Sequence, residues 1–263
     1  MRTSNLITDG APAPVDAVSH LPPPPTRLSP PAALFLDMDG VLAPLAETPD
    51  AVVPHPERTA ALRGVAERLG GRIAIISGRT IAEIDRIAEA SAASASGVHG
   101  LERRRADGSL DHAEAAPGVR DAVAAFEVFA RTRPGVIVED KALSAGLHYR
   151  GAPTEEAAAL ALAARLSSET GLALQAGNLV VELKTPGTSK GTALTAFMSE
   201  APFVGAVPIM LGDDLTDEDG FRAAEALGGF GVLVGPVRET AARYGLADVM
   251  AVLAWLNAVE ERA

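Results

Sequence analysis

The chain contains no cysteine among its 263 residues, and its only lysines are Lys141, Lys184 and Lys190. The absence of cysteine excludes disulfides and thiol chemistry and suits a reducing compartment. Long apolar runs are missing too, since no stretch reaches the roughly 18 uninterrupted apolar residues of a membrane-spanning helix. The opening residues also lack the apolar core of a secretory signal. We therefore expect a soluble, cytoplasmic protein that does not act at a membrane.

Basic side chains are scarce relative to acidic ones, with 23 lysines and arginines against 34 aspartates and glutamates and a net charge of −11. This balance argues against nucleic acid or an anionic membrane as the main partner. An anionic substrate must then be attracted locally, by a metal ion or by a few placed cations. A GC-rich genome explains why lysine is scarce, but it does not explain why three lysines remain. Phosphate binding is one reason to use lysine in place of arginine, because the lysine ammonium group is a compact point charge. Composition leaves the oligomeric state open.

The chain is long enough for one large domain or two smaller ones, and its hydrophobic content of 48% is ample for a core. Residues 1–30 are rich in proline and predict a disordered or polyproline-II tail. Strand and helix patterns alternate over 31–117 and again over 188–263, as in a parallel α/β sheet. Between them, residues 118–187 repeat a helix followed by two strands, which predicts an inserted α+β module. The expected fold class is a Rossmann-like, doubly wound α/β core interrupted by a smaller domain.

The hydrophobic patterns also give the bounds of the expected elements. In the α/β part, the expected strands cover 34–36, 73–76, 95–98, 207–211 and 230–234, and the expected helices cover 56–69, 81–88, 189–199, 221–227 and 248–259. In the insert, the expected helices cover 119–130 and 154–169, and the expected strands cover 136–138, 143–149, 172–174 and 179–183. Residues 103–111 predict a turn around Asp107 and Gly108.

Polar residues follow the predicted parallel strands or begin the helices after them. They are Asp37, Asp39, Ser77, Lys190, Asp213, Asp214 and Asp217. Because the carboxyl ends of parallel strands face one way, these groups can share one crevice. Several carboxylates in one crevice repel each other unless a cation neutralises them, and Mg²⁺ suits a site of few carboxylates plus phosphate and water. Each feature alone is more often a turn, a helix cap or a solvated charge, so their joint order carries the prediction.

In this order the residues resemble the four motifs of the haloacid-dehalogenase superfamily of phosphotransferases. The first motif matches 37–41, the second Ser77, the third Lys190, and the fourth Gly212 and Asp213 with Asp217. The resemblance implies that Asp37 attacks phosphorus and forms an aspartyl-phosphate. It implies that Asp39 protonates the departing oxygen and then takes a proton from the attacking water.

The same resemblance implies a magnesium site and a phosphoryl site. Mg²⁺ would be held by Asp37, by the backbone carbonyl of Asp39 and by Asp213, with Asp214 and Asp217 as further ligands or as residues behind the ligands. Ser77 and Lys190 would bind the transferring phosphoryl group. Gly40 would let the chain turn away where a side chain might obstruct that group.

Further residues resemble the trehalose-6-phosphate phosphatases within that superfamily, over nearly all of the chain after the tail. The matching stretches are 34–44, 49–50, 76–79, 98–102, 138–141, 148–150, 181–184 and 212–219. That family commonly has Phe and Thr where this chain has Met38 and Val41, and neither difference removes a reacting group. The resemblance implies a Mg²⁺-dependent phosphatase for trehalose 6-phosphate, with the insert as a cap that closes over the disaccharide.

The resemblance also implies sugar-binding residues on the cap and on the core. They are Glu139, Lys141, His148, Arg150, Glu182 and Lys184 on the cap, and Arg79 and His99 on the core. Several of them fit the polar face of a half-exposed sheet equally well. A sucrose phosphate or a glucosylglycerate phosphate is the alternative substrate. A catalytically silent regulatory domain is the alternative outside enzymes, and the intact catalytic motifs count against it.

Overall fold

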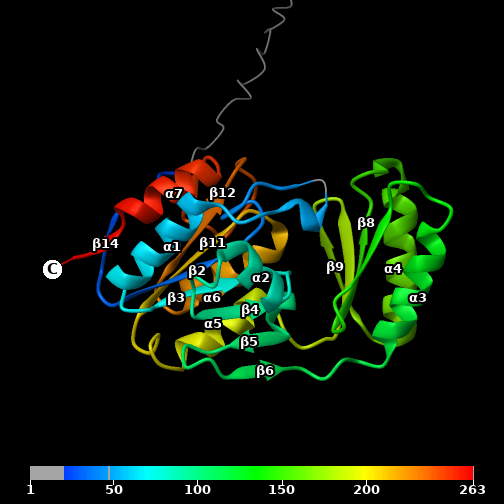
Figure 1. The fold of residues 1–263 in the computed structure, drawn as a ribbon, viewed down its shortest axis with the longest axis horizontal. Coiled ribbons are helices and arrows are strands. Elements are labelled where there is room, and N and C mark those ends of the chain that lie inside the picture. The colour runs from blue at the N-terminus through cyan, green and yellow to red at the C-terminus, as the bar shows by residue number, and fades with distance from the viewer. Residues whose placement is uncertain (1–20, 47, 263) are drawn as a thin grey trace, which may run out of the picture.

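The computed structural model describes residues 21–46 and 48–262. Its largest element is an eight-stranded sheet in the order β13-β12-β11-β2-β3-β4-β5-β6 (Figure 1). The parallel strands are β2 (Ala32–Leu36), β3 (Ile73–Ile76), β4 (Ser94–Gly97), β11 (Val207–Gly212), β12 (Phe230–Val234) and β13 (Tyr244–Leu246). This confirms the predicted α/β core.

The far end of the sheet differs from the prediction of a simple turn over 103–111. There, β5 (Glu102–Arg104) and β6 (Leu110–His112) form a hairpin that extends the sheet in the antiparallel sense. Five residues join the two strands, which is too short for the crossover that a parallel pair needs. The sheet is therefore mixed rather than purely parallel.

Helices cover both faces of the large sheet, as in a doubly wound fold. The first face carries α1 (Pro56–Arg68), α2 (Ile81–Ala88) and α7 (Val249–Ala258), and the second carries α5 (Lys190–Met198) and α6 (Glu218–Ala226). In the fully buried β2, Leu34 and Leu36 pack on the first side, whereas Phe35 packs on the second against Phe197 and Phe203. A strand buried on both faces explains the continuous apolar run in the sequence.

The insert forms a four-stranded antiparallel sheet in the order β7-β8-β10-β9, with two helices on its outer face (Figure 1). Its elements are α3 (Gly118–Ala130), β7 (Ile137–Asp140), β8 (Ser144–His148), α4 (Glu156–Thr170), β9 (Ala173–Gly177) and β10 (Val180–Lys184). Alternate residues such as Leu147 and Val181 are buried against the helices. The other face is polar and lies toward the α/β core, as a cap domain requires. The boundaries 118–187 remain a prediction.

The tail predicted over 1–30 stays a prediction for residues 1–20, which lie outside the described ranges, whereas residues 21–30 are extended and pack against the core. β1 (Arg27–Leu28) pairs in parallel with β14 (Glu260–Glu261) near the end of the chain. The carbonyl of Pro25 accepts a hydrogen bond from the indole of Trp255. Proline lacks an N–H donor, but its carbonyl still accepts, so a proline-rich segment can pack in extended form.

Short 3-10 helices lie in the loops, namely η1 (Pro49–Ala51), η2 (Val98–Gly100), η3 (Pro153–Glu155) and η4 (Leu215–Asp217). Three of them, η1, η2 and η4, contribute residues to the pocket between core and cap. Among the helices of the described ranges, none is long and apolar enough to cross a membrane.

Candidate active site

A pocket lies between the carboxyl ends of the core strands and the polar face of the cap sheet. Its walls include Asp37, Asp39, Ser77, Arg79, His99, Lys190, Asp213 and Asp214 from the core, and Glu139, Lys141, His148, Arg150 and Glu182 from the cap. The structure therefore brings together most of the residues that the sequence singled out. Gly40, Lys184 and Asp217 do not line this pocket, and each is described below.

Lys190 lies among the acidic strand ends, at the first position of α5. A capping box between Ser189 and Thr192 fixes this helix start. Nζ of Lys190 lies 2.8 Å from Oδ2 of Asp37 and 2.7 Å from Oδ1 of Asp217, and all three side chains are buried. Burial opposes the charge on Lys190, but the two carboxylates outweigh it and raise its pKa above the ordinary range. Lys190 is thus a fixed positive charge beside Asp37.

One lysine does not neutralise all the carboxylates of this cluster. Burial, followed by repulsion from Asp217, raises the pKa of Asp37 to about 7 although Lys190 acts against it. Burial, followed by repulsion from Asp37, raises the pKa of Asp213 to about 8. Both shifts mean that the charged forms lack sufficient compensation.

The arrangement fits a divalent metal ion. Carboxylate oxygens of Asp37, Asp213 and Asp217 lie within 4.8 Å of one another and could hold such an ion. Oδ1 of Asp37 is buried and has no hydrogen-bond partner among the described residues. Gly40 leaves the space open, because a Cβ at that position would lie 2.0 Å from Oδ2 of Asp213. A site with only oxygen ligands and surplus negative charge suits a hard cation.

Asp217 and Asp214 have different places in the structure. Oδ1 of Asp217 accepts a hydrogen bond from Lys190. Oδ2 of Asp217 accepts from two backbone N–H groups, that of Asp213 at 3.0 Å and that of Asp214 at 3.1 Å. It therefore shapes the loop that presents Asp213. The side chain of Asp214 caps η4 and also accepts from the N–H of Asn178 in the cap. Asp214 lies outside the acidic group, so the geometry does not support the metal-ligand role predicted for it.

Ser77 follows β3 and is almost completely buried in the pocket wall. Its N–H donates to the carbonyl of Ser96, and its own carbonyl accepts from the N–H of His99. Its Oγ accepts a bond of 3.3 Å from the N–H of Arg79. A hydroxyl that accepts from the backbone still has its hydrogen to donate to a group in the pocket.

Arg79 holds Asp39 with a two-pronged ion pair. Nε donates to Oδ2 and Nη2 donates to Oδ1 of Asp39, both at 2.7 Å. Nη1 donates to the carbonyl of Pro49 at 3.0 Å and lies 3.4 Å from Oε1 of Glu83. Burial opposes the charge on Arg79, but hydrogen bonding to Asp39 raises its pKa above the ordinary value. The predicted sugar ligand Arg79 is thus largely engaged with the predicted acid and base.

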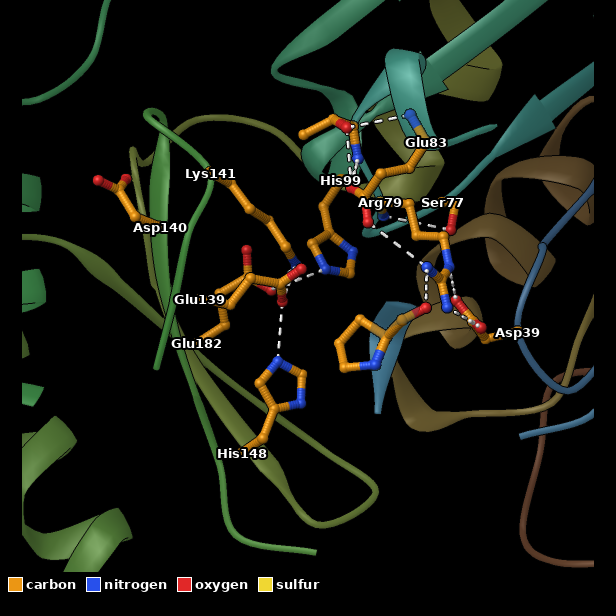
Figure 2. A network of polar contacts seen from close by, with 12 residues as sticks. Asp39, Ser77, Arg79, Glu83, His99, Glu139, Asp140, Lys141, His148 and Glu182 are labelled. Atoms are coloured by element: carbon orange, nitrogen blue, oxygen red, sulfur yellow. Dashed lines mark hydrogen bonds and ion pairs between the residues drawn. The ribbon is translucent and has the colours of Figure 1, made fainter. Parts of the chain in front are cut away.

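A chain of ion pairs crosses the polar face of the cap (Figure 2). Oε2 of Glu139 lies 2.8 Å from Nε2 of His148 and 3.2 Å from Nζ of Lys141. Nζ of Lys141 lies 3.6 Å from Oε2 of Glu182, whose buried Oε1 has no hydrogen-bond partner among the described residues. Burial opposes the charge on Glu182, but Lys141 and then His99 lower its pKa below the ordinary range. This wall of fixed charges suits a ligand rich in hydroxyl groups.

His99 carries this network from the cap to the core. Its Nε2 lies 3.2 Å from Oε2 of Glu182 (Figure 2). The imidazole packs so closely on Gly78 that a Cβ added to Gly78 would lie 2.5 Å from Nε2. His99 has a left-handed backbone with φ of 53°. Burial lowers the pKa of His99, although Glu182 acts in the opposite direction. His99 therefore joins core and cap as a buried imidazole.

The remaining predicted sugar ligands differ in position. Arg150 lines the pocket and donates to the carbonyl of Asn178 at 3.0 Å. Nζ of Lys184 donates to the carbonyl of Thr188 at 2.8 Å, in the segment that leads from the cap back to the core. Burial lowers the pKa of Lys184. Lys184 is thus part of the connection rather than of the pocket wall.

Gln175 lines the pocket but was missed in the sequence. It lies on β9 opposite Glu182, and its Nε2 lies 3.0 Å from the imidazole nitrogens of His99. The predicted strand ended at 174, because Gln175 and the two residues after it are not a hydrophobic run. Continuing the alternation of β9 by one position would have placed Gln175 on the polar face.

The core carries Asp37 and Asp213 directly after strands and Lys190 at the start of α5. Its capped, doubly wound fold is shared with solved phosphatases of the haloacid-dehalogenase superfamily. The fold is similar to that of a HAD-superfamily phosphatase from Bacteroides thetaiotaomicron, with a TM-score of 0.54 and 19% identity over 93% of this chain and 97% of that one. Residues 35–250 match the model of the trehalose-phosphatase family. The chain belongs to this trehalose-phosphatase family.

The relatives of the chain agree with this assignment. It is 41% identical to the trehalose-6-phosphate phosphatase of Escherichia coli K12 over 235 residues, which are 89% of this chain and 88% of that protein. The fold is similar to the C-terminal domain of Candida albicans trehalose-6-phosphate phosphatase, with a TM-score of 0.76 and 22% identity, over 86% of this chain and 90% of that one.

Proposed function

We propose that the protein hydrolyses trehalose 6-phosphate to trehalose and phosphate as a step of trehalose biosynthesis. The observation that carries the proposal is the position of Asp37, which lies beside Lys190 at the strand ends and faces the polar wall of the cap. One side of the pocket suits a phosphoryl group and the other suits a sugar. The family of the chain and its relative in Escherichia coli support the same substrate.

The reaction would proceed in two displacements on phosphorus. A carboxylate oxygen of Asp37 attacks phosphorus, the bond from phosphorus to the sugar oxygen breaks, and that oxygen takes a proton from Asp39. A water oxygen then attacks the aspartyl-phosphate, the bond to Asp37 breaks, and Asp39 accepts the proton of the water. Lys190 and the hydroxyl of Ser77 bind phosphoryl oxygens as negative charge shifts between them.

We further propose Mg²⁺ as the cofactor, with Asp37 and Asp213 as side-chain ligands and Asp217 supporting the loop of Asp213. When bound, Mg²⁺ supplies positive charge to the phosphoryl oxygens and to the Asp37 carboxylate. The raised pKa values of Asp37 and Asp213 support this assignment, because both carboxylates need a cation to be ionised together.

The cap, over residues 118–187, would select the sugar. Glu139, Lys141, His148 and Glu182 lie on one face of its sheet and could bind the hydroxyl groups of a disaccharide. Closure of the cap over the bound substrate would exclude bulk water from the phosphoryl site.

Steady-state phosphate release from a panel of sugar phosphates, with Mg²⁺ and with excess EDTA, tests the proposal. We expect the highest kcat/KM for trehalose 6-phosphate and no turnover in EDTA. Asp37→Asn should abolish phosphate release while circular dichroism and the melting transition show an intact fold. Higher kcat/KM for sucrose phosphate or glucosylglycerate phosphate would reject trehalose 6-phosphate as the substrate. Binding of sugar phosphates without turnover would favour the regulatory alternative.

A further inference from the structure

Arg79 is built into the core by more contacts than its predicted role as a sugar ligand requires. It is 6% exposed, and four of its five N–H groups are directed at Asp39, Pro49 and Glu83. Glu83 is itself fixed, because its Oε2 accepts from the backbone N–H and the hydroxyl of Thr80 at the start of α2. The guanidinium is therefore held on the side away from Asp39 by a helix cap and a backbone carbonyl.

The Asp39 carboxylate has little support of its own. Its side chain is 31% exposed, whereas the side chain of Arg79 is 8% exposed. Among the described residues, both oxygens of Asp39 accept from Arg79 alone. A partly exposed aspartate in the loop after β2, with no contact of this kind, would sample several rotamers in a water-filled pocket. A planar guanidinium that binds both oxygens fixes the orientation as well as the position of the carboxylate.

We propose that Arg79 is a positioning residue for the acid and base Asp39, and not a ligand of the substrate. The inference rests on the proposed function, because it assigns Arg79 a place in that reaction. Asp39 has to meet the departing sugar oxygen in the first step and the water in the second, at nearly the same point in space. Arg79 holds the carboxylate of Asp39 at one place in the pocket for both steps. Each carboxylate oxygen keeps a further lone pair for the transferred proton while it accepts from Arg79.

A double-mutant cycle in the full-length protein tests this inference. The variants are Arg79→Met, Asp39→Asn and the two combined, with kcat and KM measured for trehalose 6-phosphate at saturating Mg²⁺. Misplacement of a reacting group by about 1 Å costs about 100-fold in rate, so we expect a kcat loss of that order in Arg79→Met. KM should change little. The combined variant should be no slower than Asp39→Asn alone, because Arg79 acts only through Asp39.

Arg79→Lys and Arg86→Met complete the design. Lysine keeps the charge but cannot bind both oxygens of Asp39, so Arg79→Lys should recover little of the kcat lost in Arg79→Met. Arg79→Lys also replaces Arg79→Met in the cycle if the methionine variant does not fold. Arg86 lies on α2 and donates to the carbonyl of Val52 at 3.0 Å. It therefore anchors the loop that also contains Pro49, without touching Asp39. Arg86→Met should keep kcat within about threefold of the parent.

Three results would overturn the inference. Multiplicative losses in the combined variant would show that Arg79 acts independently of Asp39. A rise confined to KM would show that Arg79 binds the substrate, and full recovery by lysine would show that only its charge matters. The proposed function fails in a distinguishable way, namely when the parent protein does not hydrolyse trehalose 6-phosphate or when Asp39→Asn leaves kcat unchanged.

Discussion

Nε2 of His99 on the core lies 3.2 Å from Oε2 of Glu182 on the cap, and both side chains are buried. A direct contact between the two domains therefore passes through a residue that also faces the pocket. Glu182 contacts His99 and Lys141 there, and its buried Oε1 has no hydrogen-bond partner among the described residues. An unpartnered buried oxygen is a site at which a ligand hydroxyl can donate.

Glu182→Gln should weaken substrate binding more than catalysis. The amide keeps the shape of the side chain but loses the charge and one acceptor oxygen. We expect KM for trehalose 6-phosphate to rise about tenfold, equivalent to about 1.4 kcal/mol, with a smaller change in kcat. Glu169→Gln is the matched control, because Glu169 is exposed on α4 and, among the described residues, pairs only with Arg165 one turn away. Unchanged KM in Glu182→Gln would contradict the assignment of Glu182 to the sugar.

Lys190→Met should abolish activity and destabilise the fold. The substitution leaves Asp37 and Asp217 buried without their cation, which typically costs about 3–5 kcal/mol. Urea denaturation with and without Mg²⁺ measures this, and Mg²⁺ should restore part of the loss because it supplies charge to the same carboxylates. Lys190→Arg keeps the charge and should lie between the parent and Lys190→Met in stability. A Lys190→Met variant with parental stability would show that the cluster is not held together by this charge.

The metal-free protein should become less stable as pH rises from 7 to 8.5. The pKa of Asp37 is about 7 and that of Asp213 about 8 in the folded state, both above the ordinary value, so the folded state binds more protons than the unfolded state. Stability then falls with rising pH until both groups are ionised, here by on the order of 1 kcal/mol. Burial lowers the pKa of His99, which titrates below this window and acts with the opposite sign.

Urea denaturation in EDTA at the two pH values checks this dependence. Asp213→Asn should flatten the slope and should raise stability at pH 8.5 relative to the parent, because one of the repelling charges is gone. Saturating Mg²⁺ should also flatten it, since the cation stabilises the ionised carboxylates. Stability that increases with pH in the metal-free parent would contradict the surplus of negative charge.

The sequence predicts well those parts of the site that depend on local structure. Asp37, Ser77 and Asp213 directly follow apolar strands, so a correct strand assignment places each of them at the sheet edge. On the cap, the alternation of β10 puts Glu182 on the polar face between the buried Val181 and Leu183. The hydrophobic period of the strand and the topology of the sheet are enough to place such residues, because their position follows from the backbone alone.

Contacts between distant segments are what the sequence does not reveal. The pair of Arg79 and Asp39 depends on a long side chain and on where η1 places the carbonyl of Pro49. β1 has two residues and pairs with a strand more than 200 positions later, so no local pattern indicates it. Gln175 gives no hydrophobic signal, and its place follows only from its register opposite Glu182.

Gly40→Ala should impair metal binding with little effect on the rest of the fold. Its Cβ would lie 2.0 Å from Oδ2 of Asp213, and φ at this position is 75°, so alanine both strains the backbone and displaces the carboxylate. Gly108→Ala is the control, because φ there is 84° and nothing lies within 4 Å of the added Cβ. The control carries the same kind of backbone strain without the contact to Asp213.

The concentration of Mg²⁺ that gives half-maximal activity separates the two variants. We expect it to rise at least about tenfold in Gly40→Ala, the size of effect typical when the support of a metal ligand is disturbed, and to stay unchanged in Gly108→Ala. The stabilisation of the fold by Mg²⁺, measured as a shift in melting temperature, should fall in Gly40→Ala alone. Equal losses in both variants would mean that backbone strain, and not the space beside Asp213, explains the glycine.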